Sequence, residues 1–214
     1  MKFENTAVYN IYNAILGARN PMNSWDKSDS VFKGYNGKIE NTSIGKNDLE
    51  LMQKLIKAGS EHRKFLRQIF VSVDITAPLY WWKEFDTYKV GTVANSTSTM
   101  HKLASTPITI DCFEMGDFTP FIDNFKIDLS WQTIMTYLEQ LRQRYNETKD
   151  KRYWRELIRL LPESWLQKRT ITMNYENILN MYRQRKNHKL TEWSKSFCDW
   201  VKTLPYAEEL ICLE

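Results

Sequence analysis

An apolar block at residues 69–82 is followed, four residues later, by a long polar stretch at residues 86–102. The block is dense in aliphatic and aromatic side chains, as expected of a buried strand or helix. The polar stretch consists mainly of hydroxyl, amide and cationic side chains and is too polar for a protein core. Polar side chains therefore follow a buried element closely, which is where binding and catalytic sites tend to lie.

The composition predicts one globular domain over residues 1–214. The chain is 42% hydrophobic and 14% aromatic, which is enough to fill a sizeable core. Its 30 basic and 26 acidic residues give a net charge of +4, and both signs alternate along most segments. Such dispersed charge favours small anionic ligands only weakly and is unlike a protein that wraps nucleic acid.

Two further features concern the compartment. No stretch approaches the roughly 18 uninterrupted apolar residues of a membrane span, and the N-terminus lacks the apolar core of a signal peptide. We therefore expect a cytoplasmic protein with no membrane association. Cys112, Cys198 and Cys212 are widely spaced, which favours free thiols over a disulfide or a metal site.

The spacing of apolar residues predicts an α+β protein in a layered arrangement. Apolar residues at helical spacing predict helices at residues 8–15, 47–58, 79–85, 130–145, 154–161, 174–185 and 193–204. β-branched and aromatic residues predict a strand at 65–73, before the break at Ala77-Pro78. The polar segment 20–46 predicts a loop, and residues 107–126 predict an irregular excursion or a small hairpin. In the helix from residue 130, Glu139, Arg142 and Arg144 are expected to face solvent.

The polar stretch also contains a partial match to a signature written R-H-R-x-x-S-x-N-E-x-S-x-R-Y. Thr87-Tyr88-Lys89 stands at the R-H-R, and after one extra residue, residues 94–101 stand at x-N-E-x-S-x-R-Y. With its flanking segments, this order resembles the flavin-dependent thymidylate synthases over residues 49–193. Asn95 and Ser98 are retained, and Lys89 keeps a positive charge.

Two departures fall on important positions of the signature. Ser96 replaces its glutamate, and Met100 replaces the arginine that the family uses to hold the substrate phosphate. A methionine has no hydrogen to donate to a phosphate. The candidates to replace that cation are His101, Lys102 and Lys168. The alternative interpretation of this stretch is a solvated loop followed by a Ser/Thr-rich helix cap.

The flanking segments add single residues to the resemblance. Upstream, His62 lies where the family has a flavin-contacting histidine, and Glu84 takes the place of a substrate-contacting glutamine. Downstream, Leu161-Pro162 resembles a Leu-Pro turn of the family, although Ile158 stands where the family has an arginine and Arg159 is adjacent.

The segment after residue 173 matches best. Asn174 and Asn180 keep the spacing of two flavin-contacting asparagines, and Arg185 that of a pyrimidine-contacting arginine. On a helix, Asn174 and Arg185 would differ by about 20° in direction and lie about 16 Å apart along the axis. The alternative is an exposed polar helix whose basic face is only solvated.

The resemblance implies a mixed α/β subunit, assembled as a homotetramer with each FAD at a subunit junction. The implied reaction is that of a methyltransferase of nucleotide biosynthesis: reductive methylation of dUMP, with methylenetetrahydrofolate as carbon donor and NADPH as reductant. Flavin contacts are implied for His62, Tyr88, Lys89, Asn95, Asn174 and Asn180. Substrate contacts are implied for Glu84, Ser98 and Arg185, with Arg185 also catalytic.

Three hypotheses remain open from the sequence. The first is an active flavoenzyme acting on dUMP or another pyrimidine nucleotide. The second is a protein that binds flavin or nucleotide without turnover, as the substitutions at Ser96 and Met100 favour. The third is an interaction protein on the same scaffold, with Trp81-Trp82 and the aromatic segment 198–201 forming protein contacts.

Overall fold

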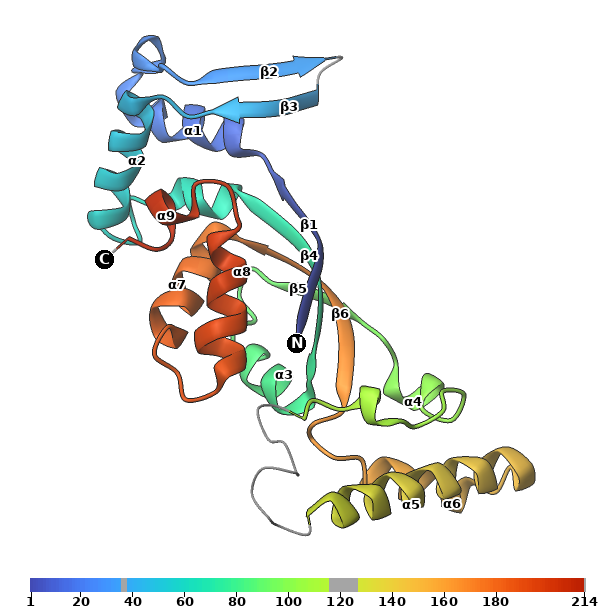
Figure 1. The fold of residues 1–214 in the computed structure, drawn as a ribbon. Coiled ribbons are helices and arrows are strands. Elements are labelled where there is room, and N and C mark those ends of the chain that lie inside the picture. Colours follow the sequence, from blue (N-terminus) through green and yellow to red (C-terminus); the bar gives the residue numbers. More distant parts are fainter. Residues whose placement is uncertain (36–37, 116–126, 214) are drawn as a thin grey trace. The chain divides into compact units, whose positions relative to one another are not determined.

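The computed structural model describes residues 1–35, 38–115 and 127–213 (Figure 1). The strands are β1 (Lys2–Tyr9), β2 (Val31–Tyr35), β3 (Lys38–Ser43), β4 (Phe70–Pro78), β5 (Val93–Ser96) and β6 (Leu166–Asn174). The α-helices are α1 (Ile11–Arg19), α2 (Lys46–Lys57), α3 (Leu79–Phe85), α4 (Thr99–Lys102), α5 (Ile127–Thr148), α6 (Lys151–Arg159), α7 (Tyr175–Arg185), α8 (Cys198–Lys202) and α9 (Ala207–Leu210). Short helical turns are η1 (Asn20–Met22), η2 (Trp25–Lys27), η3 (Lys64–Gln68), η4 (Ile110–Cys112) and the π-helical η5 (Glu192–Phe197). This mixture confirms the predicted α+β class.

The chain divides into two compact units. Unit 1 comprises Met1–Lys2, Ile75–Thr87 and Asn95–Arg169, and unit 2 comprises Phe3–Asp74, Tyr88–Ala94 and Thr170–Glu214. Strands β1, β4, β6 and β5 are hydrogen-bonded in that order, and the division falls inside all four. Strands β2 and β3 pair separately as an antiparallel hairpin. The single domain expected from the composition stays a prediction.

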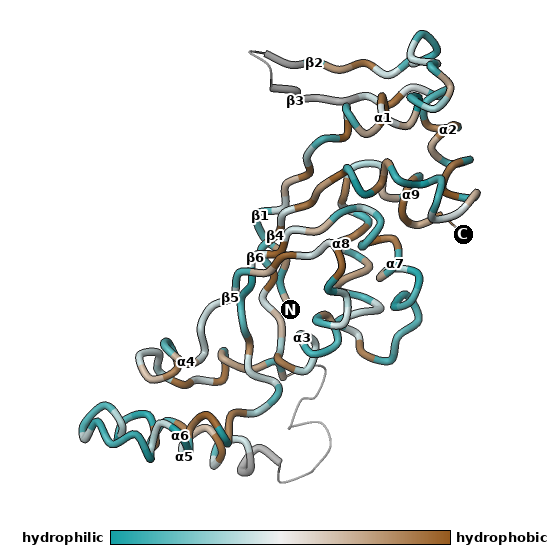
Figure 2. Tube along the Cα trace, turned by 180° about the vertical axis from the view of Figure 1, so that it is seen from behind, coloured by the Kyte–Doolittle hydropathy of each residue, from teal (hydrophilic) through white to brown (hydrophobic). Residues whose placement is uncertain are grey.

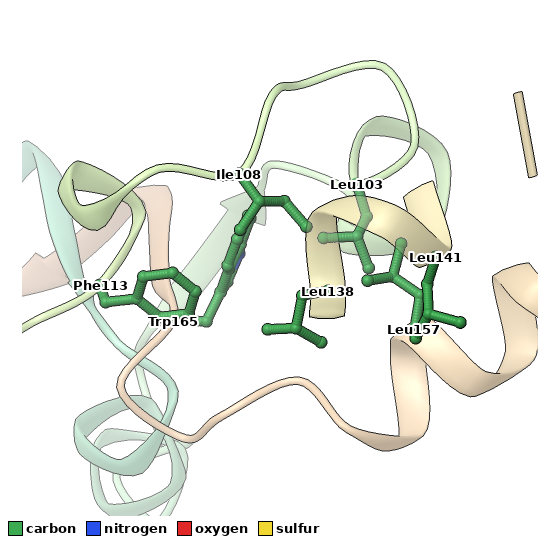
Figure 3. Packing of buried hydrophobic residues seen from close by; sticks show 7 residues of the cluster. All are labelled: Leu103, Ile108, Phe113, Leu138, Leu141, Leu157 and Trp165. Atoms are coloured by element: carbon green, nitrogen blue, oxygen red, sulfur yellow. The ribbon is translucent and has the colours of Figure 1, made fainter. Parts of the chain in front are cut away.

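The core of unit 1 joins the helical pair α5–α6 to the segment that precedes it (Figure 3). The packed side chains are Leu103, Ile108, Phe113, Leu138, Leu141, Leu157 and Trp165. The rings of Phe113 and Trp165 meet edge to face at 5.5 Å, a favoured aromatic geometry. In Figure 2, α5 and α6 carry hydrophilic and hydrophobic segments in turn, as expected of helices that bury one face only.

The tryptophan pair of α3 also belongs to the interior of unit 1. Trp81 and Trp82 are 0% and 1% exposed, and their rings meet edge to face at 4.9 Å. Trp200 of the C-terminal aromatic segment, in unit 2, is 6% exposed. The proposed use of these side chains as protein contacts is therefore wrong, because burial leaves them no surface to present to a partner.

A second correction concerns the polar side of α5. Glu139 accepts hydrogen bonds from the Ile108 amide at 2.9 Å and from Arg142 Nη2 at 2.6 Å. Arg142 Nη1 also donates to the Ala104 carbonyl at 3.1 Å. The expectation that Glu139 and Arg142 face solvent is therefore wrong: they tie residues 104–108 to the helix. Arg144 is exposed, as expected.

The N-terminal part of unit 2 differs from the sequence expectations in two places. Residues 2–9 form β1, and Asn10 takes a left-handed conformation, with φ of 71°, that separates the strand from α1. The helix predicted from residue 8 therefore begins at Ile11. The predicted loop 20–46 contains η1, η2 and the β2–β3 hairpin.

Of the remaining strands, β4 begins and ends later in the sequence than predicted, and β5 and β6 were not predicted. The strand expected at 65–73 is β4, which starts at Phe70 and ends at Pro78, while residues 64–68 form η3. In β4 buried and partly exposed side chains alternate, so one face packs on the core. Strands β5 and β6 were not expected, and Thr172–Asn174 close β6 instead of opening a helix. The excursion predicted at 107–126 contains η4, and residues 116–126 lie outside the described part of the chain.

Candidate functional site

Arg185 lies in a cluster of four side chains of unit 2, which we call the Arg185 cluster: Tyr88, Gln184, Arg185 and Trp193. Arg185 Nε donates to the Tyr88 hydroxyl at 2.9 Å, and this hydroxyl donates to Gln184 Oε1 at 2.9 Å. The guanidinium carbon lies 5.0 Å from the centre of the Trp193 ring and 5.6 Å from that of Tyr88. Both distances are typical of cation–π contacts. The hydrogen bond to Tyr88 and the two aromatic rings therefore orient the cation.

Three separate segments supply this cluster. Arg185 is the last residue of α7, and Trp193 lies in the π-helical turn η5. Such turns insert one extra residue per turn and are frequent at functional sites. Tyr88 is in the segment before β5, where the polar stretch of the sequence begins. The structure thus brings together Tyr88 and Arg185, two of the predicted site residues, in direct contact. Gln184 and Trp193 were not predicted, and the roles of Tyr88 and Arg185 stay predictions.

The Tyr88 segment is anchored to the other end of α7. Asn177 Nδ2 donates to the Val90 carbonyl at 2.7 Å. Gly91 has a φ of +79°, and a Cβ placed there would lie 3.0 Å from Asn177 Oδ1 and 3.1 Å from Asn174 Nδ2. Both the backbone conformation and the close approach require glycine at this position. The turn at Val90–Gly91 therefore fits closely against the start of the helix.

Asn174 is the N-cap of α7. Its side chain accepts from the Asn177 amide at 2.9 Å, and the Asn177 side chain accepts from the Asn174 amide at 3.1 Å, a reciprocal capping box. Its backbone is extended, with φ of −123° and ψ of 168°. The expected common helical face of Asn174 and Arg185 is therefore wrong, because Asn174 precedes the helix. Flavin contact by Asn174 stays a prediction.

A second polar cluster surrounds Glu176 at the start of α7. Arg63 Nε donates to Glu176 at 2.9 Å, Arg63 Nη2 donates to Asn180 Oδ1 at 3.2 Å, and Arg67 pairs with the second oxygen of Glu176. Burial alone would raise the pKa of Glu176, but hydrogen bonds from Arg67 and Arg63 outweigh it and hold this pKa below its ordinary value. Asn180 thus has an arginine partner within the chain.

The arginines of this cluster were missed by the sequence reasoning. Both follow the predicted His62, which is exposed, and Arg67 is exposed as well. The signal was available as the basic residues Arg63, Lys64 and Arg67 shortly after His62. Lys89, the remaining predicted flavin contact of unit 2, is also exposed.

The predicted residues of unit 1 are less constrained. Asn95 lies in β5, in which all four residues are exposed. Ser98 caps α4 by accepting from the His101 amide at 3.2 Å, so the Ser/Thr-rich helix cap of the alternative interpretation is present. Met100 is 49% exposed, and Glu84 is half-buried on α3.

Three chemical features bear on other kinds of site. Within residues 1–35, 38–115 and 127–213, no group of three or more His, Cys, Asp or Glu side chains could hold a metal ion. All three cysteines are free thiols. Burial raises the pKa of Cys198 to about 11, so this thiol stays protonated at neutral pH.

The lengths and hydropathies of the helices bear on membrane association. Over the described part of the chain, none is both long enough and apolar enough to cross a bilayer.

Comparison with known proteins defines the class of fold. No family model matches the sequence, and no curated protein matches it. The chain nevertheless has the fold of the flavin-dependent thymidylate synthases. A crystal structure of the enzyme ThyX from Helicobacter pylori, complexed with FAD and dUMP, matches over 100% of both chains with a TM-score of 0.70 and 18% identity. A second structure of the Helicobacter pylori protein with FAD and dUMP matches 99% of this chain and 97% of that one, with a TM-score of 0.69 and 18% identity. The resemblance predicted from the sequence is therefore confirmed at the level of the fold.

Proposed function

We propose that the protein binds FAD and a pyrimidine nucleotide, and that it catalyses methylation or a related modification of dUMP or of another pyrimidine nucleotide. The observation that carries this proposal is the Arg185 cluster. It combines a cation with a defined orientation and two aromatic rings at a position that matches the pyrimidine-contacting arginine of the family. Full-length similarity to proteins that hold FAD and dUMP supports the same ligands here.

The side chains of unit 2 fit a flavin dinucleotide chemically. A flavin is planar and carries a diphosphate, so it is suited to aromatic surfaces and to cations. Tyr88 supplies an aromatic ring, and His62, Arg67 and Lys89 are exposed cationic or polar side chains of the same unit. The side-chain oxygens of Asn174 and Asn180 already accept hydrogen bonds within the chain. We therefore expect these residues to contact a flavin through their remaining side-chain donors and acceptors.

Arg185 is the residue we expect to act on the nucleotide. A fixed guanidinium stabilises negative charge that develops on a pyrimidine ring, and needs no reorganisation during the reaction. The Tyr88 hydroxyl and the Trp193 ring hold this guanidinium in one orientation. When bound, the flavin would supply the redox chemistry, with NADPH as reductant and methylenetetrahydrofolate as carbon donor.

The proposal includes the remaining predicted contacts and the assembly. Asn95 would contact the flavin, and Glu84 and Ser98 the substrate. We also propose a homotetramer and a cytoplasmic location, as the resemblance implies.

A second candidate function is binding of flavin or nucleotide without turnover. It is favoured by Ser96 and Met100, which replace an acid and a phosphate-holding arginine of the family signature. Loss of a charge-assisted contact of this kind typically costs on the order of 2 kcal/mol. Such a loss weakens the binding of the nucleotide more than that of the flavin.

The first experiment is an absorbance spectrum of the purified protein after incubation with FAD and removal of unbound cofactor. A flavin band near stoichiometric occupancy is expected. NADPH oxidation is then measured with and without dUMP and other pyrimidine nucleotides. Oxidation that depends on a nucleotide supports the enzyme, and stable flavin without turnover supports the second candidate. Folded protein that retains no flavin would contradict the enzyme, and folded protein that binds neither flavin nor a pyrimidine nucleotide would contradict both candidates.

A further inference from the structure

A pocket of about 400 Å³ lies in unit 2. It shares no residue and no helix or strand with the Arg185 cluster. Its lining comes from α1, η2 and α2: Arg19, Lys27, Asn47, Glu50, Leu51 and Lys54. Three of these side chains are cationic and one is acidic. The lining therefore favours an anion, with Leu51 offering an apolar contact beside it.

Arg19 is the buried member of this lining. It is 4% exposed, its Nε donates to Asp48 Oδ1 at 2.5 Å, and its Nη1 donates to the Ser24 carbonyl at 3.3 Å. Its Nη2 is buried and has no hydrogen-bond partner among the described residues. A buried donor without a partner typically costs about 1–3 kcal/mol, so an acceptor that reached it would recover stability.

Asp48 fixes the orientation of this arginine. It also accepts from the hydroxyls of Ser30 and Ser28, at 2.5 and 2.7 Å, and from the Ser30 amide at 3.1 Å. Burial opposes its ionisation, but these hydrogen bonds and the Arg19 guanidinium together lower the pKa of Asp48. The carboxylate is thus ionised, and both of its oxygens accept hydrogen bonds within the chain.

The start of α2 does not supply the anion site. The amides of Asn47 and Asp48 both donate to the Asp29 carboxylate, at 2.9 and 3.1 Å. The positive character of the pocket therefore comes from side chains: Arg19, and the exposed Lys27 and Lys54. Glu50 opposes it, although Lys46 lies 3.9 Å from its carboxylate.

We propose that this pocket binds the oxyanion of a small phosphorylated or carboxylated molecule. Arg19 Nη2 would donate to the oxyanion, Lys27 and Lys54 would supply charge, and the Asn47 side chain would add a polar contact. A guanidinium is the side chain best suited to a phosphate or a carboxylate. This site is separate from the proposed flavin and nucleotide chemistry, and needs neither ligand.

The test is calorimetric titration of the purified full chain with inorganic phosphate and, separately, with acetate, both in chloride of matched ionic strength. Saturable binding of phosphate alone assigns a phosphorylated ligand, and saturable binding of acetate as well assigns a general oxyanion site. No saturable binding of either anion would overturn the proposal.

Paired variants locate the binding. Lys27→Gln/Lys54→Gln is expected to raise the dissociation constant about tenfold, equivalent to about 1.4 kcal/mol. The matched control Lys33→Gln/Lys57→Gln removes the same charge from exposed lysines outside the lining and should change it less than twofold. If both double variants lost affinity equally, the binding would depend only on the net charge of the protein, and the proposed site would be wrong.

Two further variants make the result specific. Glu50→Gln removes the opposing charge and should tighten binding about twofold to threefold. Arg185→Gln should leave anion binding unchanged. If Arg185→Gln abolished it instead, the anion would be occupying the proposed nucleotide site and this pocket would not be the binding site.

Discussion

The Arg185 cluster of unit 2 and residues 95–102 of unit 1, which we call the β5–α4 segment, both align with the family signature and its flanks, yet they are built differently. In the cluster, Arg185 is held by Tyr88 and Trp193. In the β5–α4 segment, Asn95 is exposed and Met100 is 49% exposed. In this segment, Ser96 and Met100 stand where the family signature has a glutamate and an arginine. The cation at the position of the family's pyrimidine-contacting arginine thus has a supporting structure, whereas the positions that depart from the signature are exposed to solvent.

Removing the retained cation should have the largest effect. Arg185→Gln is expected to weaken dUMP binding by about 100-fold, because it removes a charge held in a defined orientation. Calorimetry with dUMP measures the loss, and flavin content should change little. Tyr88→Phe keeps the charge and loses only the hydroxyl, so its effect should be several-fold smaller. Unchanged affinity in Arg185→Gln would show that the cluster is structural.

The next largest effect is expected for Glu139, which with Arg142 ties residues 104–108, the segment after α4, to α5. The hydrogen bonds from Arg142 are the main reason why the pKa of Glu139 falls from 4.5 to about 2. The stability contributed by a carboxylate with a lowered pKa is complete above the unfolded value and is lost as the pH falls through the folded one. Glu139→Gln should therefore cost on the order of 2 kcal/mol at pH 7.

Urea unfolding at several pH values checks this prediction. The difference between wild type and Glu139→Gln should shrink as the pH falls from about 4.5 toward 2. Glu147→Gln is a suitable control, since the Glu147 side chain is 63% exposed and its contact with Arg144 is 3.4 Å long. A pH-independent difference would mean that Glu139 acts through packing and not through its charge.

Restoring a lost charge should have a smaller effect of opposite sign. Met100→Arg returns the family's arginine to an exposed position, where the new side chain displaces no core contact. If the β5–α4 segment lies against substrate phosphate, dUMP should bind about tenfold more tightly. Met100→Leu is the control without charge. The same gain with a nucleoside that lacks phosphate would contradict this explanation.

The smallest effect is expected at the cap of α7. Asn174→Ala removes the acceptor for the Asn177 amide and should lower the free energy of unfolding by about 1 kcal/mol. Asn174→Ser keeps an acceptor and should lose less. Thermal unfolding measures both. Flavin content is then compared at equal folded fraction. A loss of flavin under that condition comes from a contact with the cofactor and not from the loss of the helix cap.

Sequence reasoning predicted the fold class and the resemblance because both depend on order along the chain. The succession of motifs from residue 62 to residue 185 survives even where single residues have changed. The helix at 130–145, the helix at 79–85 and the C-terminal aromatic helix follow from local periodicity, and the structure contains them as α5, α3 and η5–α8.

What the sequence did not predict depends on tertiary context. Glu139 and Arg142 have the pattern of a solvated face, but the carbonyl and amide groups of residues 104–108 make them partly buried. Strand β6 has near its start the polar residues Gln167, Lys168 and Arg169, which gave no strand signal. The β2–β3 hairpin did leave a signal, since Asn36-Gly37 is a dipeptide typical of hairpin turns.

The segment before β5 is hydrogen-bonded to α7 at two places. Val90 accepts from Asn177 near the start of the helix, and Tyr88 bonds to Gln184 and Arg185 at its end, a span of about 10 Å along the axis. Opening either end of the helix therefore breaks contacts of the same short segment. Amide protons of α7 and of this segment should exchange with solvent as one cooperative unit, with a single opening free energy. The orientation of the Arg185 guanidinium is thus coupled to the start of its helix, and sequence changes at Gly91 or Asn177 act on it from a distance.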